Sequence, residues 1–216
     1  LRAAEQRGVA AAPEQAWRGV IGWRLALGKA LEEYEQGEVD QAAAWLAVAD
    51  VELAAPVAAE YSQLYFWSCE ILRAAGRTRA ALAACEKLVA GDPANAEAWN
   101  QLGASLHQAK RYEEALQALA QAIALDPQWT LPRIHTGRSL RALGRLEAAV
   151  TEFSQVLQIE PHNVWARVEL GTMALDANDC AAAAVHIKAI ASQPISSTAL
   201  ARRADTFSKR YREMCD

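Results

Sequence analysis

The sequence lacks any apolar run long enough to cross a bilayer, since a membrane-spanning helix needs about 18 consecutive apolar residues. It also lacks a recognisable secretory leader in the residues given. The chain begins at Leu1 rather than Met, so a removed targeting segment stays open. We therefore expect no membrane insertion and a cytoplasmic location.

Catalytic and metal-binding motifs are missing as well. The sequence has no nucleophile elbow, phosphate-binding loop or HExxH pattern. Its four histidines lie apart on different predicted helices and a turn, and pairs such as Glu113 and Glu114 are typical of an exposed helix face. We therefore expect no enzyme activity, no cofactor and no metal.

The four cysteines form neither a CxxC pair nor a zinc-ligand spacing. Three of them, Cys69, Cys85 and Cys180, fall within predicted helices, where a free thiol behaves as a small buried hydrophobe. This pattern predicts reduced cysteines in a reducing compartment.

An excess of positive charge is also absent. The formal net charge is −4 and the sequence pI is about 5.7, which argues against a nucleic-acid partner. Alanine is abundant instead, together with Leu, Glu, Gln and Arg, and these residues favour helices. The composition thus predicts an all-α protein.

A 34-residue period organises the chain, because that interval separates Pro93 from Pro127 and Pro127 from Pro161. The same step relates three glycines and three alanines: Gly103, Gly137 and Gly171, and Ala115, Ala149 and Ala183. A mid-helix glycine costs about 1 kcal/mol relative to alanine, so its recurrence in register predicts close helix packing. Self-similarity at a fixed period predicts stacked units in an elongated binding scaffold.

Each unit reads as two helices joined by a tight turn. In residues 96–127, both halves place apolar residues on one face at helical spacing: Trp99, Leu102 and Leu106, then Leu116, Leu119 and Ile123. Residues 109–111 must reverse the chain, and Gly144 takes the slot of Lys110 in the next unit, which suits a left-handed helix C-cap. The spacing therefore predicts antiparallel helix pairs, the second helix ending at Pro127.

These residues resemble the tetratricopeptide repeat, whose signature contains W-x2-L-G, a later Ala and a closing Pro. Here they are Trp99, Leu102, Gly103, Ala115 and Pro127. The resemblance implies a right-handed superhelical solenoid of antiparallel helix pairs. It covers five copies, the first of them degraded: 23–56, 62–95, 96–129, 130–163 and 164–197. We expect a half-repeat and an extended first helix in 1–22, and a capping helix in 198–216.

The resemblance also implies a groove, because in this family four positions of each first helix line the concave face. Carried onto this sequence, those positions give the candidate partner-binding residues: Phe66, Glu70, Arg73, Asn100, His107, Leu131, Ile134, Arg138, Arg141, Trp165 and Val168. Arg73, His107 and Arg141 share one slot in successive repeats and predict a basic stripe that accepts carboxylates, beside apolar pockets.

An alternative reading has no groove. A neighbouring helix then covers Trp165 and Phe66, and the arginines pair with Glu70 or Glu97. The slots with which some family members hold the acidic tails of heat-shock chaperones do not match in the first three well-formed repeats: they contain Phe66, Glu70, Gln101, Leu131 and His135.

The function predicted is a protein-interaction scaffold that binds a protein or peptide with acidic groups. Two alternatives stay open. The chain could be the accessory region of a larger enzyme of the glycosyltransferase, sulfotransferase or methyltransferase type. It could also be a self-assembling scaffold and form homo-oligomers.

Overall fold

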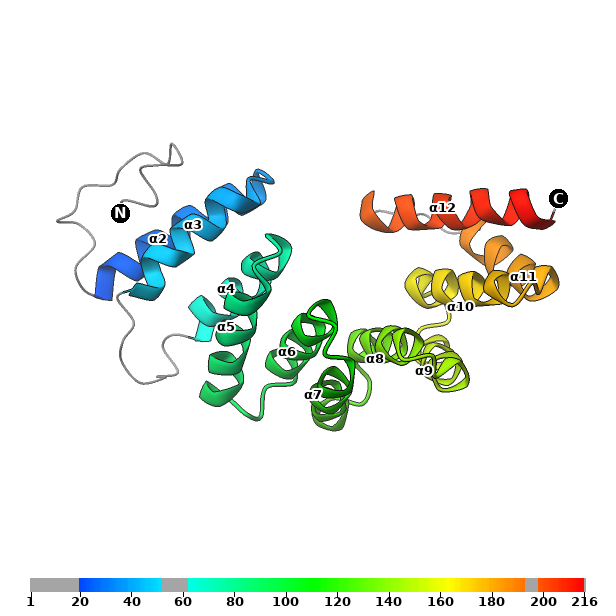
Figure 1. Ribbon diagram of the computed structural model, residues 1–216, viewed down its shortest axis with the longest axis horizontal. Coiled ribbons are helices and arrows are strands. Elements are labelled where there is room, and N and C mark those ends of the chain that lie inside the picture. Colours follow the sequence, from blue (N-terminus) through cyan, green and yellow to red (C-terminus); the bar gives the residue numbers. More distant parts are fainter. Residues whose placement is uncertain (1–19, 52–61, 193–197, 216) are drawn as a thin grey trace. The chain divides into compact units, whose positions relative to one another are not determined.

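The computed structural model describes residues 20–51, 62–192 and 198–215, and those residues contain helices and turns but no strand (Figure 1). The all-α prediction is confirmed. The helices have the following bounds: α2 Val20–Glu35, α3 Val39–Val51, α4 Ser62–Ala74, α5 Thr78–Gly91, α6 Ala96–Gln108, α7 Tyr112–Leu125, α8 Thr130–Ala142, α9 Leu146–Ile159, α10 Val164–Asp176, α11 Cys180–Ala191 and α12 Thr198–Cys215.

The chain divides after Leu125 into two units, which are described separately: α2–α7 and α8–α12. Consecutive helices pack in pairs, α2 with α3, α4 with α5, α6 with α7, α8 with α9 and α10 with α11, as the spacing predicts. Apart from the start of α2, the half-repeat expected in 1–22 lies outside the described residues. The other repeat boundaries stay predictions. Among the described helices, none combines the length and the apolar character needed to cross a bilayer.

The turn inside each pair uses one residue with a left-handed backbone. Gly76, Lys110, Gly144 and Asn178 follow one another at intervals of 34 residues, and their φ angles are 68°, 62°, 75° and 59°. Around Lys110, the amide of Arg111 donates to the carbonyl of Leu106 at 2.9 Å and so closes the C-terminus of α6. The left-handed cap predicted at this slot is therefore present.

The mid-helix glycines mark the closest approach of the two helices in a pair. A Cβ atom on Gly103 would stand 2.5 Å from Cγ of Leu119, and one on Gly137 would stand 2.6 Å from Cζ of Phe153. Ala115 and Ala149, on the second helices, are 0% exposed. The close packing predicted for these small residues agrees with this geometry.

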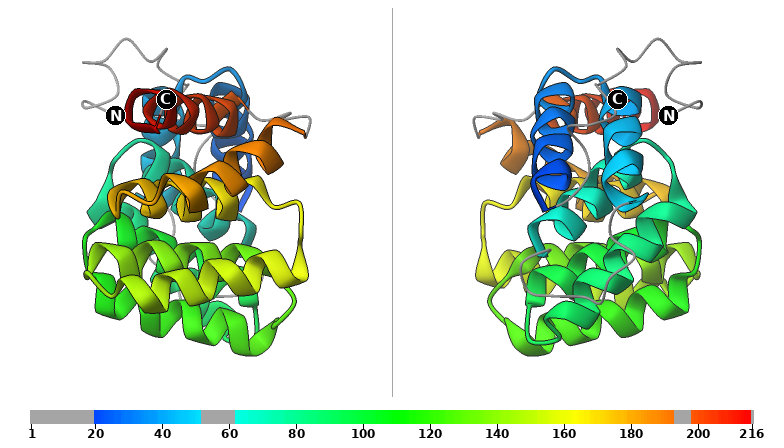
Figure 2. Two further views of the ribbon diagram at one scale, coloured as in Figure 1. Left: turned by 90° about the vertical axis from the view of Figure 1, so that its right-hand side faces the viewer. Right: turned by 90° about the vertical axis from the view of Figure 1, so that its left-hand side faces the viewer.

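The last pair departs from that pattern because α12 takes part in it. A Cβ atom on Gly171 would stand 2.3 Å from Cζ of Phe207 in α12, rather than meeting a side chain of α11 first. α12 contacts both α10 and α11 (Figure 2). The capping helix predicted for the C-terminal segment is therefore built into the core of the last pair.

The four cysteines are not free thiols, so that prediction is wrong. Cys69 of α4 is disulfide-bonded to Cys85 of α5, with the Cα atoms 5.1 Å apart. Cys180, the first residue of α11, is bonded to Cys215, the last residue of α12, with the Cα atoms 5.6 Å apart. Both distances lie in the range of protein disulfides. Each bond thus links two helices that already pack together.

Candidate functional site

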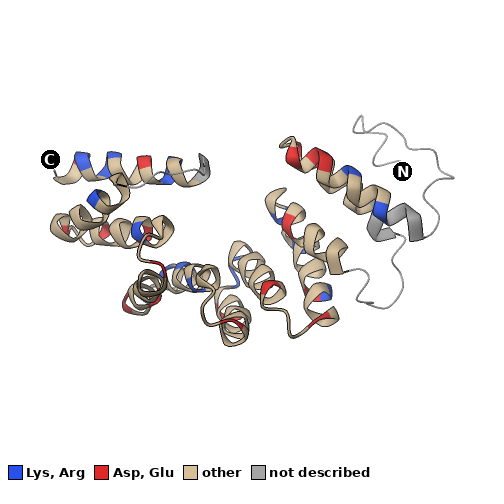
Figure 3. Cartoon of the chain, turned by 180° about the vertical axis from the view of Figure 1, so that it is seen from behind, with Lys and Arg blue, Asp and Glu red and all other residues tan. Residues whose placement is uncertain are grey.

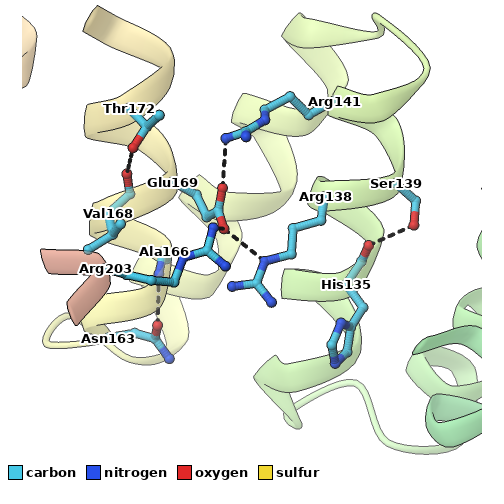
Figure 4. Close-up of polar contacts among 10 residues, drawn as sticks. All are labelled: His135, Arg138, Ser139, Arg141, Asn163, Ala166, Val168, Glu169, Thr172 and Arg203. Carbon is cyan, nitrogen blue, oxygen red and sulfur yellow. Dashed lines mark hydrogen bonds and ion pairs between the residues drawn. The ribbon is translucent and has the colours of Figure 1, made fainter. Parts of the chain in front are cut away.

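Three arginines converge on one buried carboxylate in the second unit (Figure 4). Glu169 of α10 is 1% exposed. Its Oε1 accepts from Nε of Arg138 at 2.8 Å and from an Nη of Arg203 at 2.9 Å, and its Oε2 accepts from an Nη of Arg141 at 2.8 Å. The site therefore joins α8, α10 and α12.

Three positive groups face one negative group in this cluster, so its formal charge is +2. A buried carboxylate needs partners of this kind, because an unpaired charge away from water is costly. Burial lowers the pKa of Arg138, Glu169 raises it, and Arg203 and Arg141 lower it further. One Nη of Arg138 is buried without a hydrogen-bond partner among the described residues.

Trp165 of α10 lies against the same cluster. The guanidinium carbon of Arg138 is 4.9 Å from its ring centroid, and that of Arg203 is 5.5 Å away. Two cations over one indole hold the ring in place and leave it half-buried. The result is a partly exposed aromatic surface beside an excess of positive charge.

The other candidate residues of this unit divide by exposure. Leu131 of α8 is 38% exposed and offers apolar surface. Ile134 and Val168 are buried, and Val168 packs in the cluster that contains Phe207 of α12. These two side chains belong to the core, contrary to the expectation that they line a groove, because helix packing covers the faces on which they lie.

In the first unit, the alternative reading of the arginines is correct for one pair. Arg73 forms an ion pair with Glu70, one helical turn away. Glu70 also accepts from the hydroxyl of Tyr34 at 3.4 Å, and burial and the charge of Glu70 raise the pKa of that tyrosine. Phe66 is half-buried and meets Trp67 edge to face, with the ring centroids 5.3 Å apart.

Asn100 and His107, the two other candidates of the first unit, are buried and partly buried respectively. Asn100 is 3% exposed, and its Oδ1 is buried without a partner among the described residues. His107 lies beside Tyr112, with the ring centroids 5.3 Å apart. Arg73 and His107 lie in one unit and Arg141 in the other, so the basic stripe stays a prediction.

The sequence reasoning missed two members of the cluster, Glu169 and Arg203. Arg138 and Arg141 lie three residues apart and therefore share a helix face, which is a signal that a carboxylate could face both. Arg203 carried no such signal, because it lies beyond the repeats. Figure 3 shows that α12 is rich in basic residues.

Among the described residues, no three side chains of His, Cys, Asp or Glu lie together in a way that could bind a metal ion. The arginine cluster, with its excess of positive charge beside the half-buried Trp165 ring, is chemically suited to an anionic group next to an aromatic ring.

Comparison with protein families gives two matches, both to models described as tetratricopeptide repeat, over residues 72–139 and 136–199. No curated protein sequence is significantly similar to the chain.

Solved structures of similar fold include three bacterial proteins. A thermophilic TPR protein of Thermus thermophilus is 19% identical, with a TM-score of 0.68, over 87% of this chain and 99% of that one. A tetratricopeptide repeat protein of Parabacteroides merdae is 14% identical, with a TM-score of 0.72, over 100% and 84%. MamA of Desulfovibrio magneticus is 16% identical, with a TM-score of 0.60, over 90% and 97%. At these identities the likeness concerns the fold alone.

Proposed function

The chain belongs to the tetratricopeptide repeat family, and we propose that it is a non-catalytic scaffold that binds an acidic peptide segment of a protein partner at the Trp165 site. By the Trp165 site we mean Trp165, Arg138, Arg141, Arg203 and the exposed part of Leu131. The observation that carries the proposal is the half-buried indole held beside two arginines in a cluster of formal charge +2.

The chemistry of the cluster selects the ligand. Glu169 neutralises one of the three arginines, and the side chains of Arg141 and Arg203 are 34% and 45% exposed, so a ligand can reach them. A carboxylate of the partner would accept charge-assisted hydrogen bonds here. An apolar neighbour of that carboxylate would pack on Trp165 and Leu131, and tryptophan is a frequent hot-spot residue.

Isothermal titration with synthetic peptides tests the proposal. The probes are peptides that combine several glutamates with one leucine or phenylalanine, and matched peptides in which every glutamate is glutamine. We expect binding of the acidic peptides only. Trp165→Ala should weaken it by about 2 kcal/mol or more if the indole is a hot spot.

Lys188→Ala is the matched control, because Lys188 is an exposed cation of the same unit on α11. This variant should bind as the parent does. Equal binding of acidic and glutamine peptides, or an unchanged affinity in Trp165→Ala, would contradict the proposal. Concentration-dependent growth in mass without peptide would favour a self-assembling scaffold instead.

The cysteines bear on the compartment. Disulfides persist in oxidising compartments and are rare in the cytosol. Because Cys69 is bonded to Cys85 and Cys180 to Cys215, we infer an oxidising compartment in place of the expected cytoplasmic one. Alkylation of thiols in intact cells should leave Cys69 and Cys85, which are fully buried, unmodified. Full alkylation before any reduction would contradict the inference.

A further inference from the structure

The C-terminal helix α12 contributes a residue to the Trp165 site and is covalently fixed at its far end. We propose that the Cys180–Cys215 disulfide, called the latch below, is redox-labile and that its oxidation state sets the affinity of the site through Arg203. The inference rests on the proposed function of that site, but its first readout is independent of any ligand.

Without α12 the site is incomplete. Arg203 is the only one of the three arginines around Glu169 that comes from outside the helix pairs, and it also lies over Trp165. If α12 left its place, the cluster would keep two arginines against one carboxylate, and its formal charge would fall from +2 to +1. Trp165 would lose one of its two cation contacts as well.

The latch fixes α12 at the end opposite to the site. Cys215 ends the helix, and Arg203 lies twelve residues earlier, which is about 18 Å along a helix. Between them, Phe207 is buried against Gly171, and Arg210 pairs with Asp176 at 2.7 Å. That ion pair is substantially exposed, so it stabilises little. Tyr211 also packs against the core of the last pair, so the latch and this contact together restrain the C-terminal half of α12.

The two disulfides differ in access to a reductant. Cys69 and Cys85 are 0% exposed in the core of their helix pair, and Ser105 lies against both sulfurs. Cys180 and Cys215 are only partly buried. Exposed disulfides are the labile and regulatory ones. A mild dithiol should thus open the latch and leave Cys69–Cys85 intact.

The reaction is a thiol–disulfide exchange with a dithiol reductant. One thiolate of the dithiol attacks a latch sulfur and forms a mixed disulfide, and the other latch sulfur leaves as a thiolate and is protonated. The second thiolate of the dithiol then displaces the remaining cysteine. Two electrons and two protons pass to Cys180 and Cys215, and the reductant closes to its own disulfide.

The first experiment follows reduction and α12 together. The full chain is titrated with dithiothreitol, alkylated and mapped by mass spectrometry, while amide hydrogen exchange is measured over 198–215. We expect Cys180 and Cys215 to be alkylated first, and exchange in α12 to rise at least tenfold at that point. Earlier reduction of Cys69–Cys85, or unchanged exchange after the latch opens, would overturn the proposal.

The second experiment links the latch to binding. Opening the latch should weaken binding of the acidic peptide about tenfold, and the Cys180→Ser, Cys215→Ser double variant should bind equally weakly without reductant. In Arg203→Ala the same reduction should change the affinity much less, because the substitution and the reduction both remove the same contact, that of Arg203 with the site. Full additivity of the two effects would overturn the proposal.

The two proposals fail in different ways. If exchange in α12 rises on reduction but no acidic peptide binds in either state, the redox lability of the latch stands, whereas the proposed function and the control of affinity are both wrong. If Trp165→Ala abolishes binding but latch reduction leaves the affinity unchanged, the proposed function stands and the latch is overturned.

Discussion

At the scale of single residues, the left-handed turn position keeps the same backbone conformation although the residue type changes from one pair to the next. The slot holds glycine at Gly76 and Gly144, but lysine at Lys110 and asparagine at Asn178. A residue with a Cβ atom pays about 1–2 kcal/mol for a left-handed backbone. The glycines of the sequence predict a left-handed backbone at this position. The 34-residue period extends that prediction to Lys110, although lysine alone would not indicate such a backbone.

Lys110→Gly should therefore stabilise the chain by about 0.5–1 kcal/mol, since glycine adopts this backbone at no steric cost but loses more entropy on folding. Urea unfolding followed by circular dichroism measures the change. The converse variant Gly144→Lys should destabilise by a similar amount, because no neighbour lies within 4 Å of an added Cβ and only the backbone is affected. A lower stability of Lys110→Gly would contradict the cap assignment.

A second prediction for a single residue concerns His186 of α11. Burial, and to a smaller extent Arg167, lowers the pKa of His186 from its ordinary value of 6.5, and its Nδ1 is buried without a partner among the described residues. The unfolded chain therefore binds a proton that the folded chain resists. This contribution to stability is complete above pH 6.5 and is lost as the pH falls toward the lowered pKa.

The unfolding free energy of the parent should therefore fall between about pH 7.5 and about pH 5.5, and that of His186→Leu should fall less over the same range. Urea titrations of parent and variant at a series of pH values give the slopes. Equal slopes in the two proteins would show that His186 titrates alike in the folded and unfolded chain.

At the scale of helices and their pairs, the period also predicts which residues of the two helices face each other. A first-helix glycine and the residue 16 positions later face each other in two pairs, Gly103 with Leu119 and Gly137 with Phe153. Cys69 and Cys85 have the same spacing, so their disulfide follows from the repeat. A short cysteine motif does not reveal it, because the two residues lie 16 positions apart.

The position of α12 could not be found in this way. The period predicts Ile187 as the side chain that faces Gly171, yet Phe207 takes that place. Phe207 follows residues outside the repeat, and no spacing rule fixes how a capping helix docks. Arg203 was therefore beyond reach of the sequence, whereas the neighbouring Arg138, Arg141 and Trp165 were named from their slots.

Gly137→Ala tests the closeness of the helix pairs. The added methyl group would stand 2.6 Å from the ring of Phe153, which is 0% exposed and has no space to yield. We expect a destabilisation of about 1–3 kcal/mol from overpacking, read as a lower melting temperature.

Gly28→Ala in α2 is the matched control. An added Cβ there meets nothing within 4 Å, so the better helix propensity of alanine should stabilise by up to about 1 kcal/mol. A destabilising Gly28→Ala, or a neutral Gly137→Ala, would show that the packing register is wrong.

At the scale of the whole molecule, the sign of the charge is a local property. The chain carries a net charge of −4, but α12 has five basic residues against two acidic ones, and the cluster of Glu169 with its three arginines has a formal charge of +2. Composition alone therefore predicts a weakly acidic protein and hides the local excess of positive charge beside Trp165. The period reveals which arginines share a face, and packing decides how far each of them is exposed.

This division of charge predicts how salt acts on binding of an acidic peptide. The side chain of Arg141 is 34% exposed, so its attraction is screened once the Debye length shrinks from about 10 Å at 0.1 M salt to about 3 Å at 1 M. The contact with Trp165 is apolar and does not depend on screening. Arg141→Ala should thus weaken binding clearly at low salt and little at high salt, whereas Trp165→Ala should cost the same at both. Titrations at two salt concentrations decide the matter: if the effect of Arg141→Ala is constant, that arginine supports the fold of the site rather than attracting the ligand.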